Sequence, residues 1–487
     1  MSNVRAFALF LLVFAALFVA GCGEDAASGP GGASVAPASA PLFVSIDTDS
    51  SSEQWKQAGA LLDKFPDGDK LIASALDELS EEGVDFQRDV EPALGPETDI
   101  VGLDLSGEGK FVGLTQPDDK QKFEDLMAKG DEEVFTRELD GWTVFADSEA
   151  ILDEFESARE YGRLAESSEY QDAIDQIDPD GIASVYLNGK ALADTIAREE
   201  PASSAQLETI FPGGKIPSFA ISLKAEDGGV RIEGGAKVAE DDTRFTGENF
   251  DAQLPDEVPG GALLYLDLNN LEEGLSAARD ALAQQNPQFD QDLARIEAAL
   301  GVSLEGDIFP LFSGETALYV RPSLIIPEVT LVTHVEDEDA AMATLDKLVS
   351  GLGAYLPVAP HANDVDIDGV KAKELPLQPP VSLYWAAFDG HLVLSTSREG
   401  IAALRSDDNR LADDEDFKRA LEQADVPDET TGFAYVNLHD AISSILGFAG
   451  AEVPPEVRAN LEPLDTFVAY GSKDGATLRF AAFLAVH

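Results

Sequence analysis

The chain has 487 residues, of which 33 are lysine or arginine and 92 are aspartate or glutamate, giving a formal net charge of −59 at pH 7. A charge of this sign and size repels nucleic acid and anionic lipid, which excludes a nucleic-acid partner. The sequence contains one cysteine. Internal disulfides and cysteine-type zinc sites are therefore excluded as well.

The first 22 residues predict a lipoprotein signal peptide. Arg5 precedes an apolar run over residues 6–20, which is shorter than a comfortable membrane span. The run ends in Leu17-Phe-Val-Ala-Gly-Cys22, which resembles the bacterial lipobox. We expect residues 1–21 to be removed and a lipid on Cys22 to anchor the protein to the cell membrane, outside the cytoplasm. The alternative is an ordinary signal peptide with an incidental cysteine.

Composition divides the rest of the chain. Residues 22–41 are rich in glycine, alanine, serine and proline without apolar periodicity, which predicts a flexible tether. We expect a first repeat domain over residues 42–240, an acidic, proline-containing linker over residues 241–259, and a second repeat domain over residues 260–487.

The two domains are predicted from a stretch that occurs twice. Residues 83–98 and 301–316 align at a constant offset of 218 residues, which predicts a tandem duplication. Six positions are identical in the two copies: Gly83 and Gly301, Val84 and Val302, Asp89 and Asp307, Pro92 and Pro310, Glu97 and Glu315, Thr98 and Thr316.

The residues of this repeated motif have evident folding roles. Gly83 can end a helix because glycine adopts the left-handed conformation without a steric penalty. Asp89 can cap a helical turn, and Pro92 fits the first turn of a helix. The alternative makes Asp89 and Glu97 paired acids for catalysis or metal binding. We interpret the motif as structural.

Alternating and amphipathic patterns predict the elements of the first repeat in chain order. They are a strand at 42–47, a helix capped by Ser50 and Glu53, a helix from about residue 70, strands at 99–105 and 110–115, a helix capped by Asp118, a hairpin of 133–139 and 142–146 around Asp140-Gly141, helices from Ser148 and Ser168, a strand at 182–188, a helix at 191–198, and a hairpin of 218–224 and 230–238.

The second repeat follows the same order. Its predicted strands are 262–268, 316–320, 331–333, 390–394 and 435–437, with a helix at 340–348 and a closing hairpin of 466–472 and 476–486. The offset between the repeats grows from 218 to 249 residues, which predicts an added hairpin near residues 352–380. The fold class is therefore α+β, with two tandem homologous domains. Each is expected to be a mostly antiparallel sheet with amphipathic helices on one face.

Motifs for known chemistry are missing from the sequence. The five histidines are His334, His361, His391, His439 and His487. No two of them have helical ligand spacing, so we expect no metal. Asp364–Gly369 begins like a calcium loop, but its twelfth position is Leu375, and a strand entering a tight turn is favoured. Neither a nucleophile elbow nor a phosphate-binding loop is present. We expect no catalytic residue and no cofactor.

The spacing of glycine, aspartate, proline and apolar residues in the motif resembles a family of uncharacterised bacterial secreted proteins and lipoproteins, defined as a domain of unknown function. The segment from Asp389 to Ile401 is similar to the same family. The resemblance covers nearly all of the chain after residue 41. It implies a fold and carries no known catalytic residues.

The sequence thus predicts a lipid-anchored extracytoplasmic protein with a non-enzymatic binding or scaffold role at the cell envelope. Its partners are the membrane, through the lipid, and an envelope protein or ligand that the sequence does not identify. One alternative is a lipid or glycolipid carrier with an apolar cavity. Another is a hydrolase that uses carboxylates, which would require convergent carboxyl groups with raised pKa in a cleft.

Overall fold

The computed structural model describes residues 31–68, 86–129, 133–199, 215–238, 247–286, 288–323, 326–353, 360–377, 381–406, 409–449 and 453–487. The predicted signal peptide, Cys22 and the predicted helix from residue 70 lie outside this range. In the described part of the chain, no helix combines the length and the apolarity that crossing a membrane requires.

The chain forms two compact units. Unit 1 comprises Met1–Ala239, Ala451–Leu464 and Gly475–His487, and unit 2 comprises Glu240–Gly450 and Asp465–Asp474. The units divide near residue 240, but residues 475–487 belong to unit 1, whereas the sequence assigned them to the second domain. The last strand belongs to unit 1 because it pairs along its length with strand β8 of that unit.

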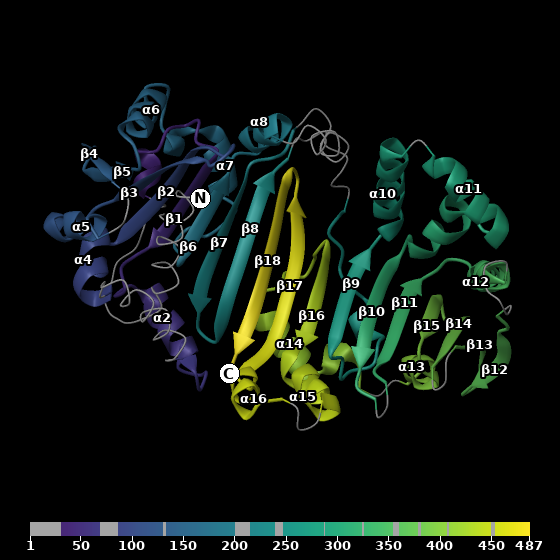
Figure 1. Ribbon diagram of the computed structural model, residues 1–487. Coiled ribbons are helices and arrows are strands. Elements are labelled where there is room, and N and C mark those ends of the chain that lie inside the picture. Colours follow the sequence, from purple (N-terminus) through teal and green to yellow (C-terminus); the bar gives the residue numbers. More distant parts are fainter. Residues whose placement is uncertain are drawn as a thin grey trace. The chain divides into compact units, whose positions relative to one another are not determined.

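Unit 1 is built on an antiparallel sheet in the order β4-β5-β3-β2-β1-β6-β7-β8-β18 (Figure 1). Its strands are β1 Leu42–Asp47, β2 Glu97–Asp104, β3 Lys110–Thr115, β4 Phe135–Leu139, β5 Trp142–Ala146, β6 Ala183–Leu187, β7 Phe219–Glu226, β8 Gly229–Lys237 and β18 Thr477–Val486. Its helices and helical turns are η1 Gly31–Ser34, α2 Glu53–Leu62, η2 Phe86–Val90, α4 Glu91–Leu94, α5 Lys120–Met127, α6 Glu149–Arg159, η3 Leu164–Glu166, α7 Ser168–Ile174, α8 Gly189–Glu199 and α16 Pro455–Leu461.

Unit 2 has an antiparallel sheet in the order β17-β16-β9-β10-β11-β15-β14-β13-β12. Its strands are β9 Leu264–Asn269, β10 Glu315–Arg321, β11 Glu328–His334, β12 Asn363–Ile367, β13 Val370–Pro376, β14 Ser382–Phe388, β15 His391–Ser395, β16 Gly432–Asn437 and β17 Leu464–Asp474. Its helices and helical turns are η5 Leu254–Asp256, α10 Leu271–Gln285, α11 Phe289–Leu300, η6 Leu304–Ile308, η7 Phe309–Phe312, α12 Glu338–Leu352, α13 Arg398–Leu404, η8 Leu411–Asp413, α14 Glu415–Gln423 and α15 Leu438–Ala449.

Most predicted elements are confirmed to within a few residues, including the mixed helix and strand class and the added hairpin, which is β12 and β13. Two predicted helix caps are wrong by one or two positions. The side chain that accepts a backbone N–H of the first helical turn is Ser52 in α2, from Trp55, and Asp119 in α5, from Gln121 and Lys122. Candidate capping residues stand next to one another at both places, so sequence alone does not separate them.

Helices cover both faces of the unit 1 sheet, so the expectation of helices on one face is wrong. Ile100 packs in a cluster with Trp55 of α2. The next residue, Val101, points to the opposite face and packs in a cluster with Phe155 of α6. Because successive side chains of a strand alternate between faces, consecutive apolar residues indicate burial on both sides.

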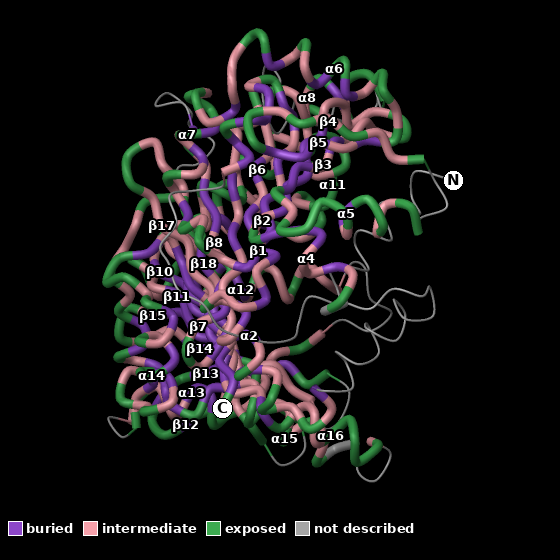
Figure 2. The backbone as a smooth tube through the Cα atoms, turned by 90° about the vertical axis from the view of Figure 1, so that its left-hand side faces the viewer, coloured by how far each residue is buried: buried purple, intermediate pink, exposed green. Residues whose placement is uncertain are grey.

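Unit 2 is also covered on both faces. Leu392 of β15 lies in a cluster with Leu345 of α12. Tyr265 of β9 packs edge to face against Phe417 of α14, with ring centroids 6.0 Å apart. Buried residues follow the strands of the sheets, whereas the outer turns of the helices are exposed (Figure 2).

The expectation of a flexible tether over residues 22–41 is corrected from residue 31 onward. Val35, Ala36 and Ala40 are at most 1% exposed and belong to the core of unit 1. The Leu164 N–H donates to the Ala36 carbonyl oxygen at 2.9 Å. Small apolar residues between prolines have no helix or strand period, so this packed segment has the composition of a linker.

The predicted linker over residues 241–259 is corrected in the same way where it is described. Leu254 and Val258 are fully buried within unit 2. The Phe250 N–H donates to the Thr430 carbonyl oxygen at 2.8 Å, and Leu411 N–H donates to the Val258 carbonyl oxygen at 3.0 Å. This stretch is therefore part of the second folded unit.

Candidate metal centre

Two neighbouring strands of unit 2 place His334 and His391 side by side. His334 is the last residue of β11, His391 is the first residue of β15, and the two are direct partners in the antiparallel register. Directly opposed residues of an antiparallel pair point to the same face of the sheet. The imidazole ring centroids are accordingly 4.5 Å apart.

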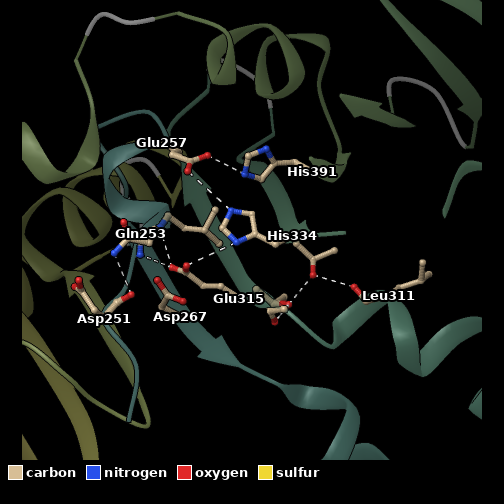
Figure 3. A network of polar contacts seen from close by, with 12 residues as sticks. Asp251, Gln253, Glu257, Asp267, Leu311, Glu315, His334 and His391 are labelled. Carbon is tan, nitrogen blue, oxygen red and sulfur yellow. Dashed lines mark hydrogen bonds and ion pairs between the residues drawn. The ribbon is translucent and has the colours of Figure 1, made fainter. Parts of the chain in front are cut away.

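Glu257 reaches both histidines from the segment before β9 (Figure 3). Its Oε2 atom lies 2.8 Å from His391 Nε2, and its Oε1 atom lies 3.9 Å from His334 Nε2. One nitrogen or oxygen atom from each of these three side chains lies within 4.8 Å of the others. The Arg410 guanidinium donates to the Glu257 carbonyl oxygen, which holds the backbone of this residue in place.

Glu315, the first residue of β10, lies next to the Nδ1 side of the His334 ring. Its Oε1 atom accepts the N–H groups of Gln253 at 2.9 Å and Leu254 at 2.8 Å. Its Oε2 atom lies 3.9 Å from His334 Nδ1. Glu315 therefore connects the segment that carries Glu257 to the strand that lies beside His334.

Asp267 of β9 extends this polar group into the core. The Tyr265 hydroxyl donates to Asp267 Oδ2 at 2.5 Å. Burial, and to a smaller extent the charge of Glu315, raise the pKa of Asp267 to about 8. Burial also raises the pKa of Glu315, against two backbone N–H groups that lower it. At pH 7 Asp267 is therefore mostly protonated, and its side chain lowers the pKa of Glu315.

The His391 imidazole offers a nitrogen ligand to this group of side chains. Burial lowers the pKa of His391 below its usual value, which favours the neutral imidazole, the form whose lone pair can bind a cation. His391 Nε2 is buried and has no hydrogen bond of acceptable geometry, although a Glu257 oxygen is close. This nitrogen and the neighbouring Glu257 oxygen, 2.8 Å apart, are thus placed to bind one cation together.

The three side chains form a ligand set that suits a divalent transition metal. Two imidazoles and one carboxylate are typical of zinc sites that leave a fourth position open. The side chains of Glu257, His334 and His391 are 41%, 33% and 14% exposed, so solvent reaches this position. A centre of this kind can bind and exchange a metal ion.

The structure revises the sequence-based search for sites. The histidines are not scattered, since two of the five meet on paired strands. His361, His439 and His487 are not members of this group. Glu257 gave no sequence signal. The two histidines gave a weak one, because His334 directly follows the predicted strand 331–333 and His391 lies in the predicted strand 390–394.

Other candidate residues have structural roles. Asp89 forms ion pairs with Arg88 and Lys129, both at 2.7 Å. The segment from Asp364 is confirmed as a strand entering a turn, with Gly369 in the left-handed region at φ +86°. Asp364 itself pairs with Lys373 at 2.8 Å.

Comparisons with known proteins place the chain in a family. No curated protein matches it. Two crystal structures of TP0453 are similar in part: form IV is 12% identical over 46% of this chain and 76% of that chain, and form III is 9% identical over 48% and 79%. Both TM-scores are 0.25, so this likeness carries no argument. The family described as "Protein of unknown function (DUF3352)" matches residues 114–486, and the chain belongs to it.

Proposed function

We propose that the protein binds a divalent transition metal ion at Glu257, His334 and His391, with zinc as the best match to the ligand set. The observation that carries the proposal is the convergence of two imidazoles and one carboxylate within 4.8 Å. The protein acts in this proposal as a binding protein without enzymatic activity. A chain with a net charge of −59 attracts cations to its surface and so favours metal capture.

We also propose that the two units are tandem duplicates, because corresponding strands pair in the same way. Strand β1 pairs with β2 and β6 in unit 1, and β9 pairs with β10 and β16 in unit 2. Strand β3 pairs with β2 and β5, and β11 pairs with β10 and β15. The segments before the first strands form similar bridges, Pro37 with Arg163 and Pro259 with Arg410.

The duplication supports the metal site through a comparison within the chain. The positions that correspond to Glu257, His334 and His391 are Val35, Gln116 and Trp142 in unit 1. Val35 and Trp142 are buried apolar residues in the core of that unit. Unit 2 thus differs from unit 1 at all three positions, and each difference introduces a metal-ligand type.

Metal titration of residues 23–487 tests the proposal. After treatment with a chelator, calorimetric titration with zinc in 0.5 M NaCl should show one site per chain, because the salt screens weak binding to surface carboxylates. His334→Ala and His391→Ala should each weaken binding by about 100-fold or more, and Co²⁺ should give the visible spectrum of a nitrogen- and oxygen-ligated site.

His361→Ala and His439→Ala are matched controls, because they remove a histidine that lies outside the site. They should leave the affinity unchanged. Binding that is equally strong in the His334→Ala and His391→Ala variants would refute the proposal.

We propose, finally, that a lipid on Cys22 holds the protein outside the cytoplasm at the cell membrane. The lipobox-like sequence and the single cysteine support this. Cys22→Ala should move the protein from the membrane fraction into an unprocessed or soluble form. A variant that is processed normally and stays in the membrane fraction would refute the anchor.

A further inference from the structure

Glu315 has two oxygen atoms with different surroundings. Oε1 accepts two backbone N–H groups, from Gln253 and Leu254. Oε2 faces Nδ1 of His334 at 3.9 Å, and a shift of about 1 Å brings this pair to hydrogen-bond distance. The carboxylate is 7% exposed, so water competes little for it.

The opposite nitrogen of the same ring faces the metal site. His334 Nε2 is the atom directed at Glu257. A neutral imidazole carries one N–H, and whichever nitrogen carries it cannot donate a lone pair to a metal. A carboxylate next to Nδ1 favours the proton on that nitrogen and leaves the Nε2 lone pair free. Glu257 lies equally far from Nε2, but its carboxylate is 41% exposed and approaches His391 more closely, so the buried Glu315 has the stronger effect on His334.

We infer that Glu315 is a positioning residue that holds His334 in the Nδ1–H tautomer and aims its Nε2 lone pair at the metal. The inference rests on the proposed metal-binding function and deepens it. Glu315 is not one of the three residues that converge on the metal position. It acts on the metal through His334.

A comparison with unit 1 distinguishes the role of Glu315 in orienting His334 from its role in folding. Glu97 corresponds to Glu315 and also fastens the segment before the first strand, since its Oε1 atom accepts the Gly32 N–H at 3.2 Å. Its Oε1 atom also lies 3.4 Å from the Ser45 hydroxyl. The residue that corresponds to His334 is Gln116, which has no imidazole to orient. The backbone role is common to both units, and the histidine is present only in unit 2.

Glu315→Gln should reverse the tautomer of His334. The two backbone N–H groups require an acceptor, so the amide oxygen of the glutamine takes the place of Oε1. The amide NH₂ then faces His334 Nδ1 as a donor, which makes Nδ1 an acceptor and moves the ring proton to Nε2. We expect the zinc affinity to fall by about 10- to 100-fold, the usual effect of losing such a partner.

The test combines two measurements on residues 23–487. Nitrogen-15 NMR of the metal-free protein, with His334 assigned through His334→Gln, reports which ring nitrogen carries the proton at pH 7.5. Zinc titration reports the affinity. The wild type should show Nδ1–H, and Glu315→Gln should show Nε2–H with weaker binding. Glu97→Gln is the matched control and should change neither result.

The outcomes separate the two proposals. If the wild type binds no zinc, the proposed function fails, whatever the tautomer is. If the wild type binds zinc but His334 carries its proton on Nε2, the role of Glu315 is overturned. The tautomer measurement uses the wild type alone, so it tests the role of Glu315 even if Glu315→Gln does not fold. Full zinc affinity in a folded Glu315→Gln protein would overturn the role as well.

Discussion

Asp267→Asn should stabilise unit 2 at neutral and alkaline pH and flatten its pH dependence. Asp267 is fully buried on β9, and burial raises its pKa from the ordinary 3.8 to about 8. The folded unit thus binds this proton more tightly than the unfolded chain does. Its stabilising contribution is complete below about pH 4 and is lost as the pH rises towards 8.

The size of the effect follows from the width of this pH window. Within it, each pH unit costs about 1.4 kcal/mol of unfolding free energy for one proton. Raising the pH from 5 to 8 should therefore cost the wild type up to about 4 kcal/mol from this group. Asparagine has nearly the shape of the protonated acid and no proton to lose, so the variant should not show this loss.

Amide hydrogen exchange of β9 and β10, read by mass spectrometry, measures the unfolding free energy of this unit in the metal-free protein. Asp251→Asn is the control, since it makes the same substitution at an exposed position beside the site. We expect the advantage of Asp267→Asn over the wild type to grow between pH 5 and pH 8. A variant that is less stable than the wild type at pH 8, or equally dependent on pH, would refute a buried neutral carboxyl at this position.

Two further predictions concern unit 1 and the whole surface. Gly32→Ala should destabilise unit 1 by about 1–3 kcal/mol, because the new Cβ would lie 1.7 Å from Asp99 Oδ2. Gly59→Ala in α2 has no atom within 4 Å of the new Cβ and should stabilise unit 1 by up to about 1 kcal/mol. Thermal unfolding compares the two variants, and equal effects would contradict the packing of residues 31–41. The melting temperature of residues 23–487 should rise as NaCl increases to about 1 M, because salt screens the repulsion among excess acidic residues, and a flat or falling melting temperature would show that these charges are locally neutralised.

Hydrophobic periodicity predicted the strands and helices of this fold, because the pattern of apolar residues within each element reflects which of its sides is buried. Strand 42–47 and the hairpin around Asp140-Gly141 were found in this way, with Asp140 at φ +52° and Gly141 at φ +87°. The packed segment over residues 31–41 was missed because small residues between prolines fit a core without showing a period. Its burial depends on the sheet beneath it, which no local pattern reveals.

The candidate metal centre could not be predicted from the sequence for a related reason. Helical ligand spacing places two ligands on one element, whereas His334 and His391 come from different strands, and Glu257 comes from a third segment. Their meeting depends on strand order and register, which hydrophobic patterns leave open. The pairing of β11 with β15 is what brings the two imidazoles together.

A buried acid pair is common to both units, although its aspartate comes from different strands. In unit 1 the buried acid is Asp99 on β2, opposite Ser45 on β1. In unit 2 it is Asp267 on β9, opposite Ala317 on β10. Under the proposed duplication, these are the same cross-strand pair with the carboxyl moved from one partner to the other.

Under the proposed duplication, the acid pair is common to both units, whereas the candidate metal site is in unit 2. The pair therefore does not depend on the candidate metal site, since the unit 1 positions that correspond to its ligands are Val35, Gln116 and Trp142. What the units do have in common is a glutamate beside the aspartate that accepts backbone N–H groups from the segment before the first strand, Glu97 from Gly32 and Glu315 from Leu254. The glutamate of the pair therefore holds that segment in both units, and in unit 2 the same segment also carries Glu257 to the two histidines.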